Sequence, residues 1–114
     1  MIIGYTGHRD KVTSVDALDH IAAKYPDAVW VHGGAKGFDT FVESYAQKHN
    51  IQSRIIKPDY ETFGKSAPHI RNREIVNTCD ILVACYDNRT TGGTYYTVTY
   101  AKQQHKPVII LSPI

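Results

Sequence analysis

Short apolar runs alternate with amphipathic stretches along the whole length of this 114-residue chain. Five apolar runs predict β-strands, the first of them buried, and they lie at residues 1–5, 28–32, 53–57, 80–86 and 107–112. Between them, apolar side chains recur at helical spacing, which predicts helices at residues 13–25, 38–46, 68–79 and 92–105. Because neighbouring parallel strands need helical crossovers, this alternation favours a parallel sheet covered by helices.

The predicted architecture is an α/β fold with a doubly wound, Rossmann-like sheet of five parallel strands and helices on both faces. Right-handed crossovers leave few topologies, and we expect the strand order 3-2-1-4-5. In such a sheet, ligands bind beyond the carboxyl ends of the strands, at the switch point between strands one and four. A binding site is therefore expected at the loops after strands one, two and four and at the start of the third helix.

Length and composition narrow the class of protein. A chain of 114 residues can build one core but not two, so we expect a single domain over residues 1–114. The net charge is +2 and the basic residues are scattered, which speaks against a nucleic-acid partner. The N-terminus lacks a signal-peptide pattern and no apolar run approaches about 18 residues, so we expect no membrane association and a cytoplasmic location. No metal-ligand spacing is present, and we expect no metal site.

Glycines and polar residues gather in the three loops that the fold places together. These loops read GYTGHRD at residues 4–10, GGAKGFD at 33–39 and YDNRTTGGT at 86–94. Glycine turns that lead into helix N-termini offer free backbone N–H groups and a partial positive charge, which suit a phosphate. None of the loops matches a Walker motif or the G-x-G-x-x-G fingerprint, so each loop taken alone is equally compatible with a plain tight turn.

The third predicted helix carries polar side chains on its inner face. Arg71 lies four residues before Ile75, and Asn72 lies four residues before Val76. An amphipathic helix ordinarily places apolar side chains there, and arginine is rarely buried without a partner. Arg71 is therefore expected to meet either a protein carboxylate such as Asp39 or an anionic ligand such as a phosphate.

Four motifs in this order resemble the SLOG superfamily, a Rossmann-like group that includes the Lonely-guy and Smf/DprA proteins, and in particular its YspA/YpsA-like branch. The motifs are TGHR, GGAKGFD, APHIRN and TTGGT, and the resemblance covers nearly the whole chain. It implies a cleft for a nucleotide or nucleotide-derived ligand, such as a mononucleotide, ADP-ribose or an NAD-like molecule. On this basis, the glycines of GGAKG are interpreted as giving a phosphate or ribose access to the backbone.

By motif match, the resemblance implies that the site residues are Gly33, Gly34, Gly37, Asp39, Arg71, Asn72, Gly92, Gly93 and Thr94. Together with polar residues of the same loops, the complete expected ligand-binding set is Gly4, Thr6, Gly7, His8, Arg9, Gly33, Gly34, Lys36, Gly37, Asp39, Arg71, Asn72, Thr91, Gly92, Gly93 and Thr94. No cofactor beyond this nucleotide-type ligand is expected.

One departure from the superfamily bears on activity. The Lonely-guy enzymes carry G-G-x-G-T-x-x-E, whose glutamate serves cleavage of the N-glycosidic bond. The corresponding stretch here is TTGGTYYT, in which Thr97 takes the position of the glutamate. The resemblance therefore implies a binding module, acting as a sensor or a sequestering protein, rather than a phosphoribohydrolase.

Two other function classes remain to be weighed against this one. The first is an enzyme that cleaves or transfers an N-glycosidic bond with Asp39 or Glu43 as its catalytic carboxylate. The second is a purely structural interaction domain, which would not explain why Arg71 and Asn72 lie on the inner face of the third helix. An aromatic stripe of Tyr95, Tyr96 and Tyr100 on the last helix also suggests a homodimer or higher homo-oligomer, a state that is common among SLOG relatives.

Overall fold

The computed structural model describes residues 1–114, which form a sheet of five strands in the order β3-β2-β1-β4-β5. The strands are β1 (Ile2–Gly7), β2 (Val29–His32), β3 (Ser53–Ile55), β4 (Ile81–Cys85) and β5 (Val108–Leu111). Every neighbouring pair runs parallel. The α/β fold class and the strand order predicted from the sequence are both confirmed.

The four helices expected from the periodicity are present, with small shifts at their ends. They are α1 (Val15–Lys24), α2 (Phe38–Lys48), α4 (Ala67–Thr78) and α5 (Gly93–Gln103). The sequence pattern predicted nothing for α3 (Tyr60–Phe63) and the following 3₁₀ turn η1 (Gly64–Ser66), because neither buries a residue. Among all these helices, none has the length and apolar character needed to cross a lipid bilayer.

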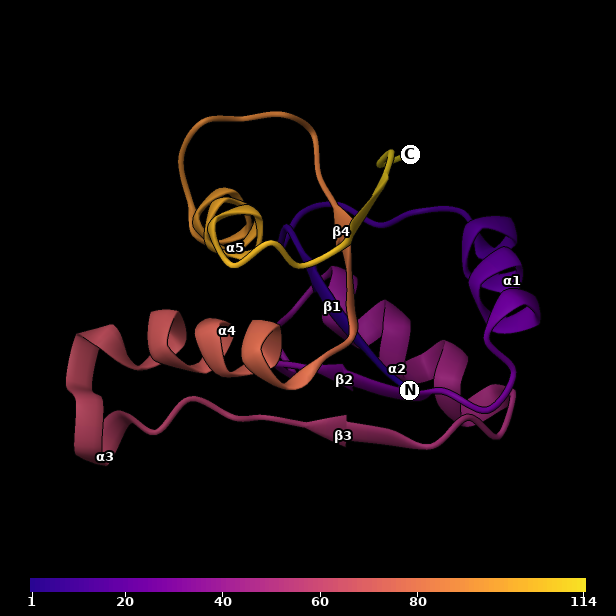
Figure 1. Ribbon diagram of the computed structural model, residues 1–114, viewed down its shortest axis with the longest axis horizontal. Coiled ribbons are helices and arrows are strands. Elements are labelled where there is room, and N and C mark those ends of the chain that lie inside the picture. Colours follow the sequence, from indigo (N-terminus) through magenta and orange to yellow (C-terminus); the bar gives the residue numbers. More distant parts are fainter.

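The hydrophobic core of this single sheet consists of two clusters of buried side chains, one under the helices on each face (Figure 1). Helices α1 and α2 cover the face on which Tyr5 and Trp30 are buried, and α4 and α5 cover the face of Val31 and Leu82. Between these layers, Gly4 lets α4 approach β1 closely, since a Cβ atom there would lie 2.9 Å from a methyl carbon of Ile75. Gly4, one of the expected ligand-binding residues, therefore serves the packing of α4 on the sheet.

The tyrosine stripe on α5 is only partly free. Tyr96 is 54% exposed. Tyr100 donates a hydrogen bond to Asn77 Oδ1 of α4 over 2.8 Å, and the guanidinium of Arg73 lies 5.5 Å from its ring centre. Part of the stripe thus fixes α5 against α4 within the chain, and the expected homo-oligomer stays a prediction.

The loop between β2 and α2 turns sharply at Gly37, where φ is +83° and ψ is −119°. A Cβ atom at this position would lie 2.2 Å from the carbonyl oxygen of Arg9, and rotation of a side chain cannot relieve a clash with backbone. Immediately beyond it, the N–H of Phe38 donates to the carbonyl oxygen of His8 over 3.3 Å. Gly37 is therefore approached by the protein's own backbone after β1. This corrects the interpretation, made from the sequence, that a phosphate or ribose approaches it.

We expect Gly37→Ala to destabilise the fold more than Gly64→Ala. Gly64 has a similar backbone conformation, with φ of +54° and ψ of −130°, but a Cβ atom there meets nothing within 4 Å. Gly64→Ala should therefore cost only the backbone strain, about 1–3 kcal/mol, whereas Gly37→Ala adds the collision with Arg9. Urea denaturation of both variants measures the difference, and equal losses would show that the close approach to Arg9 costs nothing.

Candidate ligand-binding site

A polar cavity of about 460 Å³ opens at the carboxyl ends of β1 and β4, the switch point of the sheet. Its walls come from the loop after β1, the start of α2, the first turns of α4 and the loop between β4 and α5. The lining residues are Thr6, Gly7, His8, Arg9, Asp10, Ala35, Asp39, Pro68, His69, Arg71, Asn72, Arg89, Gly92, Gly93 and Thr94. The sheet thus brings together the loops that the sequence singled out.

Ten of the sixteen expected ligand-binding residues line this cavity, and they come from all three loops and from α4. They are Thr6, Gly7, His8, Arg9, Asp39, Arg71, Asn72, Gly92, Gly93 and Thr94. The six others lie outside its lining: Gly4, Gly33, Gly34, Lys36, Gly37 and Thr91. Of these, Gly33, Gly34 and Lys36 line a neighbouring cavity that shares a wall with the first.

Arg71 reaches from α4 to the loop after β2. Its Nη1 donates to the carbonyl oxygen of Gly33 over 2.6 Å, and its Nε donates to Asn72 Oδ1 over 2.7 Å. A Cβ atom at Gly33 would lie 2.3 Å from this Nη1, so the absence of a side chain there makes room for the guanidinium. Arg71 makes no ion pair with any carboxylate. Asp39, the carboxylate that the sequence suggested as a partner, is therefore near Arg71 but not paired with it.

The N-terminus of α5 faces the cavity without a side-chain cap. Gly92 is the N-cap residue, and no side chain accepts a hydrogen bond from the first N–H groups of the helix. A Cβ atom at Gly92 would meet nothing within 4 Å, and one at Gly93 would meet only the amide nitrogen of Asn72 at 3.7 Å. These two glycines, in contrast to Gly37, border open space.

Asp39 places a carboxylate in the first turn of α2 while remaining 93% buried, since its exposed fraction is 7%. Its Oδ2 accepts a hydrogen bond from the N–H of Ala35 over 3.1 Å, and its Oδ1 has no partner. Burial raises the pKa of this carboxyl, although the Ala35 N–H and the nearby His32 and Arg71 act in the opposite direction.

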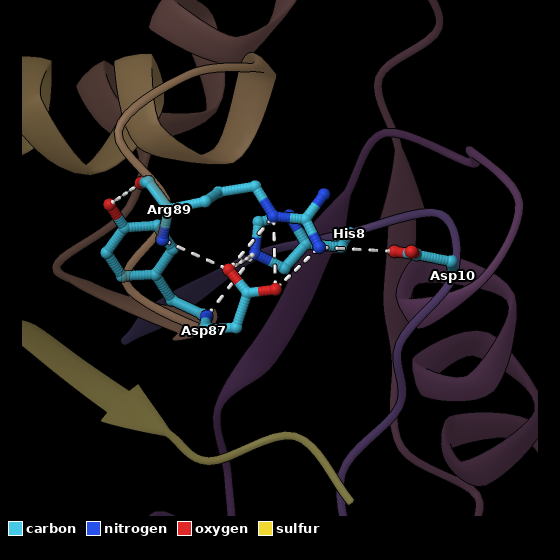
Figure 2. Close-up of polar contacts among 5 residues, drawn as sticks. His8, Asp10, Asp87 and Arg89 are labelled. Atoms are coloured by element: carbon cyan, nitrogen blue, oxygen red, sulfur yellow. Dashed lines mark hydrogen bonds and ion pairs between the residues drawn. The ribbon is translucent and has the colours of Figure 1, made fainter.

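A chain of charged groups forms the rim of the cavity between the β1 and β4 loops (Figure 2). Asp87 accepts from Arg89 Nε over 2.9 and 3.0 Å, and its Oδ1 lies 3.1 Å from His8 Nε2. Arg89 also lies 3.5 Å from Asp10 Oδ1. The hydrogen bonds from Arg89 hold the pKa of Asp87 well below its usual range, and burial together with Arg89 lowers the pKa of His8. The positive charge of Arg89 is thus balanced within the protein.

Sequence reasoning left five lining residues out of the expected set: Asp10, Ala35, Pro68, His69 and Arg89. Each lies in or directly next to one of the four sequence motifs, and this position was the available signal. Arg89 had the clearest one, because it lies in the same loop as Gly92 and Gly93.

The catalytic candidate Glu43 lies away from this cavity. Its Oε1 is 2.7 Å from His32 Nε2, and its Oε2 accepts from Gln47 and Ser53 over 2.9 and 3.1 Å. It borders a separate cavity of about 170 Å³ that Asp39 does not line. Of the two carboxylates expected for catalysis, only Asp39 shares a cavity with Arg71.

Residues 2–63 match the family described as "YspA, cpYpsA-related SLOG family". The Gene 61 protein of Mycobacterium phage D29 is 31% identical to this chain over an alignment of 116 residues. The alignment covers 96% of this chain and 92% of that protein. The chain belongs to this SLOG family. The resemblance seen in the four sequence motifs is thereby confirmed.

Solved structures agree on the fold of this SLOG protein. DNA processing protein A (DprA) from Streptococcus pneumoniae superposes with a TM-score of 0.72 at 16% identity, over 95% of this chain and 49% of DprA. HepE from Anabaena, solved in complex with UDP and glucose, superposes with a TM-score of 0.52 at 19% identity, over 94% of this chain and 28% of HepE. The chain therefore spans about half of DprA and less than a third of HepE.

Within the SLOG fold, the position that the Lonely-guy motif gives to glutamate is held here by a packed hydroxyl. Thr97 is 3% exposed and its Oγ1 donates to the carbonyl oxygen of Gly93 over 2.7 Å. A neutral hydroxyl engaged in its own helix is neither a carboxylate nor a general base at neutral pH.

We expect Asp39→Asn to stabilise the SLOG fold at neutral pH. A carboxyl whose pKa is raised on folding favours the folded state below its unfolded pKa and loses that contribution as the pH rises through its folded pKa. The melting temperature of the variant should therefore exceed that of the wild type near pH 7, and the gap should close in acid.

Thermal denaturation across this pH range measures the effect, with Asp27→Asn as a control at an exposed position. If Asp39→Asn destabilised the fold near pH 7 as much as in acid, the cost of burying this carboxylate would be disproved.

Proposed function

We propose that residues 1–114 act as one ligand-binding domain that holds a nucleotide-type ligand in the 460 Å³ cavity, as a sensor or a sequestering module. The observation that carries this proposal is the pairing of an uncapped helix N-terminus with an arginine that has no carboxylate partner. Gly92 and Gly93 supply the first, and Arg71 supplies the second. Both line the same cavity at the switch point of the sheet.

A phosphate group fits these two features. Backbone N–H groups at the start of α5 would donate to its oxygens, and the helix dipole favours negative charge there. Arg71 would add charge-assisted hydrogen bonds, since its Nη2 makes none within the protein. Arg89 contributes less, because Asp87 and Asp10 already balance its charge.

The sugar of the ligand would lie against Asp39. This carboxylate lines the cavity, and a carboxylate accepts hydrogen bonds from ribose hydroxyls. HepE, a relative in fold that was solved with UDP and glucose, adds support for a nucleotide rather than a simple anion. Mononucleotides and ADP-ribose are accordingly the first ligands to test.

Arg71→Ala is expected to lower the affinity for such ligands by about thirtyfold, or about 2 kcal/mol, because a charge-assisted contact is lost. Arg54→Ala is the matched control, since Arg54 is exposed on β3 and lines none of the described cavities. Calorimetry with mononucleotides, ADP-ribose and NAD on both variants gives the comparison. Equal affinities of wild type and Arg71→Ala for every bound ligand would remove Arg71 from the site.

Cleavage or transfer of an N-glycosidic bond is the second candidate, favoured by the single buried carboxylate in the cavity. Asp39 would stabilise positive charge that develops on the ribose ring as the base departs. Against it stands Thr97, which supplies no acid or base at the position where the Lonely-guy motif has one.

We expect no release of free base from adenosine or cytidine monophosphate by the wild-type protein. A missing acid–base group costs roughly two or more orders of magnitude in rate. Chromatography of the reaction mixture detects the base. Turnover near one per second by the wild type that disappeared in Asp39→Asn, with Asp27→Asn unaffected, would make this protein an enzyme.

A further inference from the structure

A second cavity of about 280 Å³ lies directly beside the proposed nucleotide site. The two cavities share a wall made by Arg9, Ala35, Pro68 and Arg71. Beyond this wall, the second cavity is bounded by the GGAK segment after β2 and by Pro58 and Tyr60, which precede and begin α3. A ligand that occupied both cavities would therefore lie against Arg71.

The second cavity carries uncompensated positive charge. Arg9, Lys36 and Arg71 line it, and none of the three makes an ion pair. No aspartate or glutamate is among its lining residues. Arg89 in the first cavity provides the contrast, because it is paired with both Asp87 and Asp10. Three free cations around one small cavity have the chemistry of an anion site.

The Arg71 guanidinium and the backbone of Arg9 are positioned by packing rather than by carboxylates. Arg71 is fixed from two sides by Gly33 and Asn72, and Gly33 has no space for a side chain beside it. The backbone of Arg9 is pressed against Gly37, whose Cβ would lie 2.2 Å from its carbonyl oxygen. Lys36 lies between Gly33 and Gly37 in the same loop, so these contacts place its backbone near the two arginines, and its exposed side chain lines the cavity.

We propose that this second cavity is a second phosphate subsite, so that the ligand carries two phosphate groups. One phosphate lies at the N-terminus of α5 and the other lies between Lys36, Arg9 and Arg71. This inference rests on the proposed nucleotide site and specifies the class of its ligand: a nucleoside diphosphate or a nucleoside bisphosphate rather than a monophosphate.

The test measures whether Lys36 responds to the second phosphate alone. Calorimetry compares nucleoside 5′-monophosphates of the four common bases with the corresponding 5′-diphosphates and 3′,5′-bisphosphates, on wild type, Lys36→Gln and Lys48→Gln. Lys48 is the control because it is exposed in the last turn of α2 and lines neither cavity. Lys36 is itself exposed, so its substitution should leave the melting temperature unchanged.

The wild type should bind one of the two-phosphate ligands about tenfold or more tightly than the monophosphate of the same base. Lys36→Gln should remove about tenfold from the affinity of that ligand and leave the monophosphate affinity within about twofold, whereas Lys48→Gln should change neither. This coupling between one side chain and one phosphate would establish the second subsite.

Two results would overturn the second subsite while leaving the nucleotide site in place. One is equal affinity of the wild type for mono- and two-phosphate ligands, and the other is the same loss for both classes in Lys36→Gln. If the wild type bound none of these nucleotides, the second subsite would fail, and the proposed function would fail with it if ADP-ribose and NAD did not bind either.

Discussion

The hydrogen bond from Arg71 to the carbonyl oxygen of Gly33 joins the two halves of the sheet at the site. Gly33 follows β2, on one side of the switch point, and Arg71 belongs to the helix that leads into β4 on the other. The 2.6 Å contact needs a residue without a side chain at position 33, and the second bond to Asn72 fixes the plane of the guanidinium. This contact therefore places a guanidinium at the wall that the two cavities share.

Two arginines in one cavity are thereby given different electrostatic roles. Arg89 is enclosed by Asp87 and Asp10, and it maintains the shape of the rim by joining the loop after β1 to the loop after β4 (Figure 2). Arg71 satisfies two of its nitrogens with neutral oxygens and keeps its net charge. Neutral acceptors offset part of the cost of burying a guanidinium but do not cancel its field, so the attraction for an anion persists.

The central strands β1, β2 and β4 and the four main helices could be predicted because each buries apolar side chains, as α4 does with Ile75 and Val76, whereas the outer strands β3 and β5 bury no residue and were indicated by their apolar sequences alone. The cavity followed from topology, since the carboxyl ends of β1 and β4 must meet. The roles of single glycines could not be predicted. In the sequence, both Gly37 and Gly92 are glycines before a helix, but a Cβ atom at Gly37 would collide with Arg9 whereas one at Gly92 would meet nothing. Likewise, no local pattern encodes the contacts of Glu43 with His32 and Ser53, and Glu43 lines a different cavity from Asp39 although the two are one helical turn apart.

The wall of the second cavity that comes from α3 has a consequence for how such a protein can diverge. None of the residues of α3 and η1 is buried, and Figure 1 shows this segment at the outer edge of the molecule, beside the start of α4. Substitutions there cost the core little, since surface changes ordinarily shift stability by less than about half a kcal/mol. A descendant of this chain can therefore acquire a different preference at that end of its ligand by drift in an unconstrained segment, while the arginine, the glycines and the sheet stay as they are.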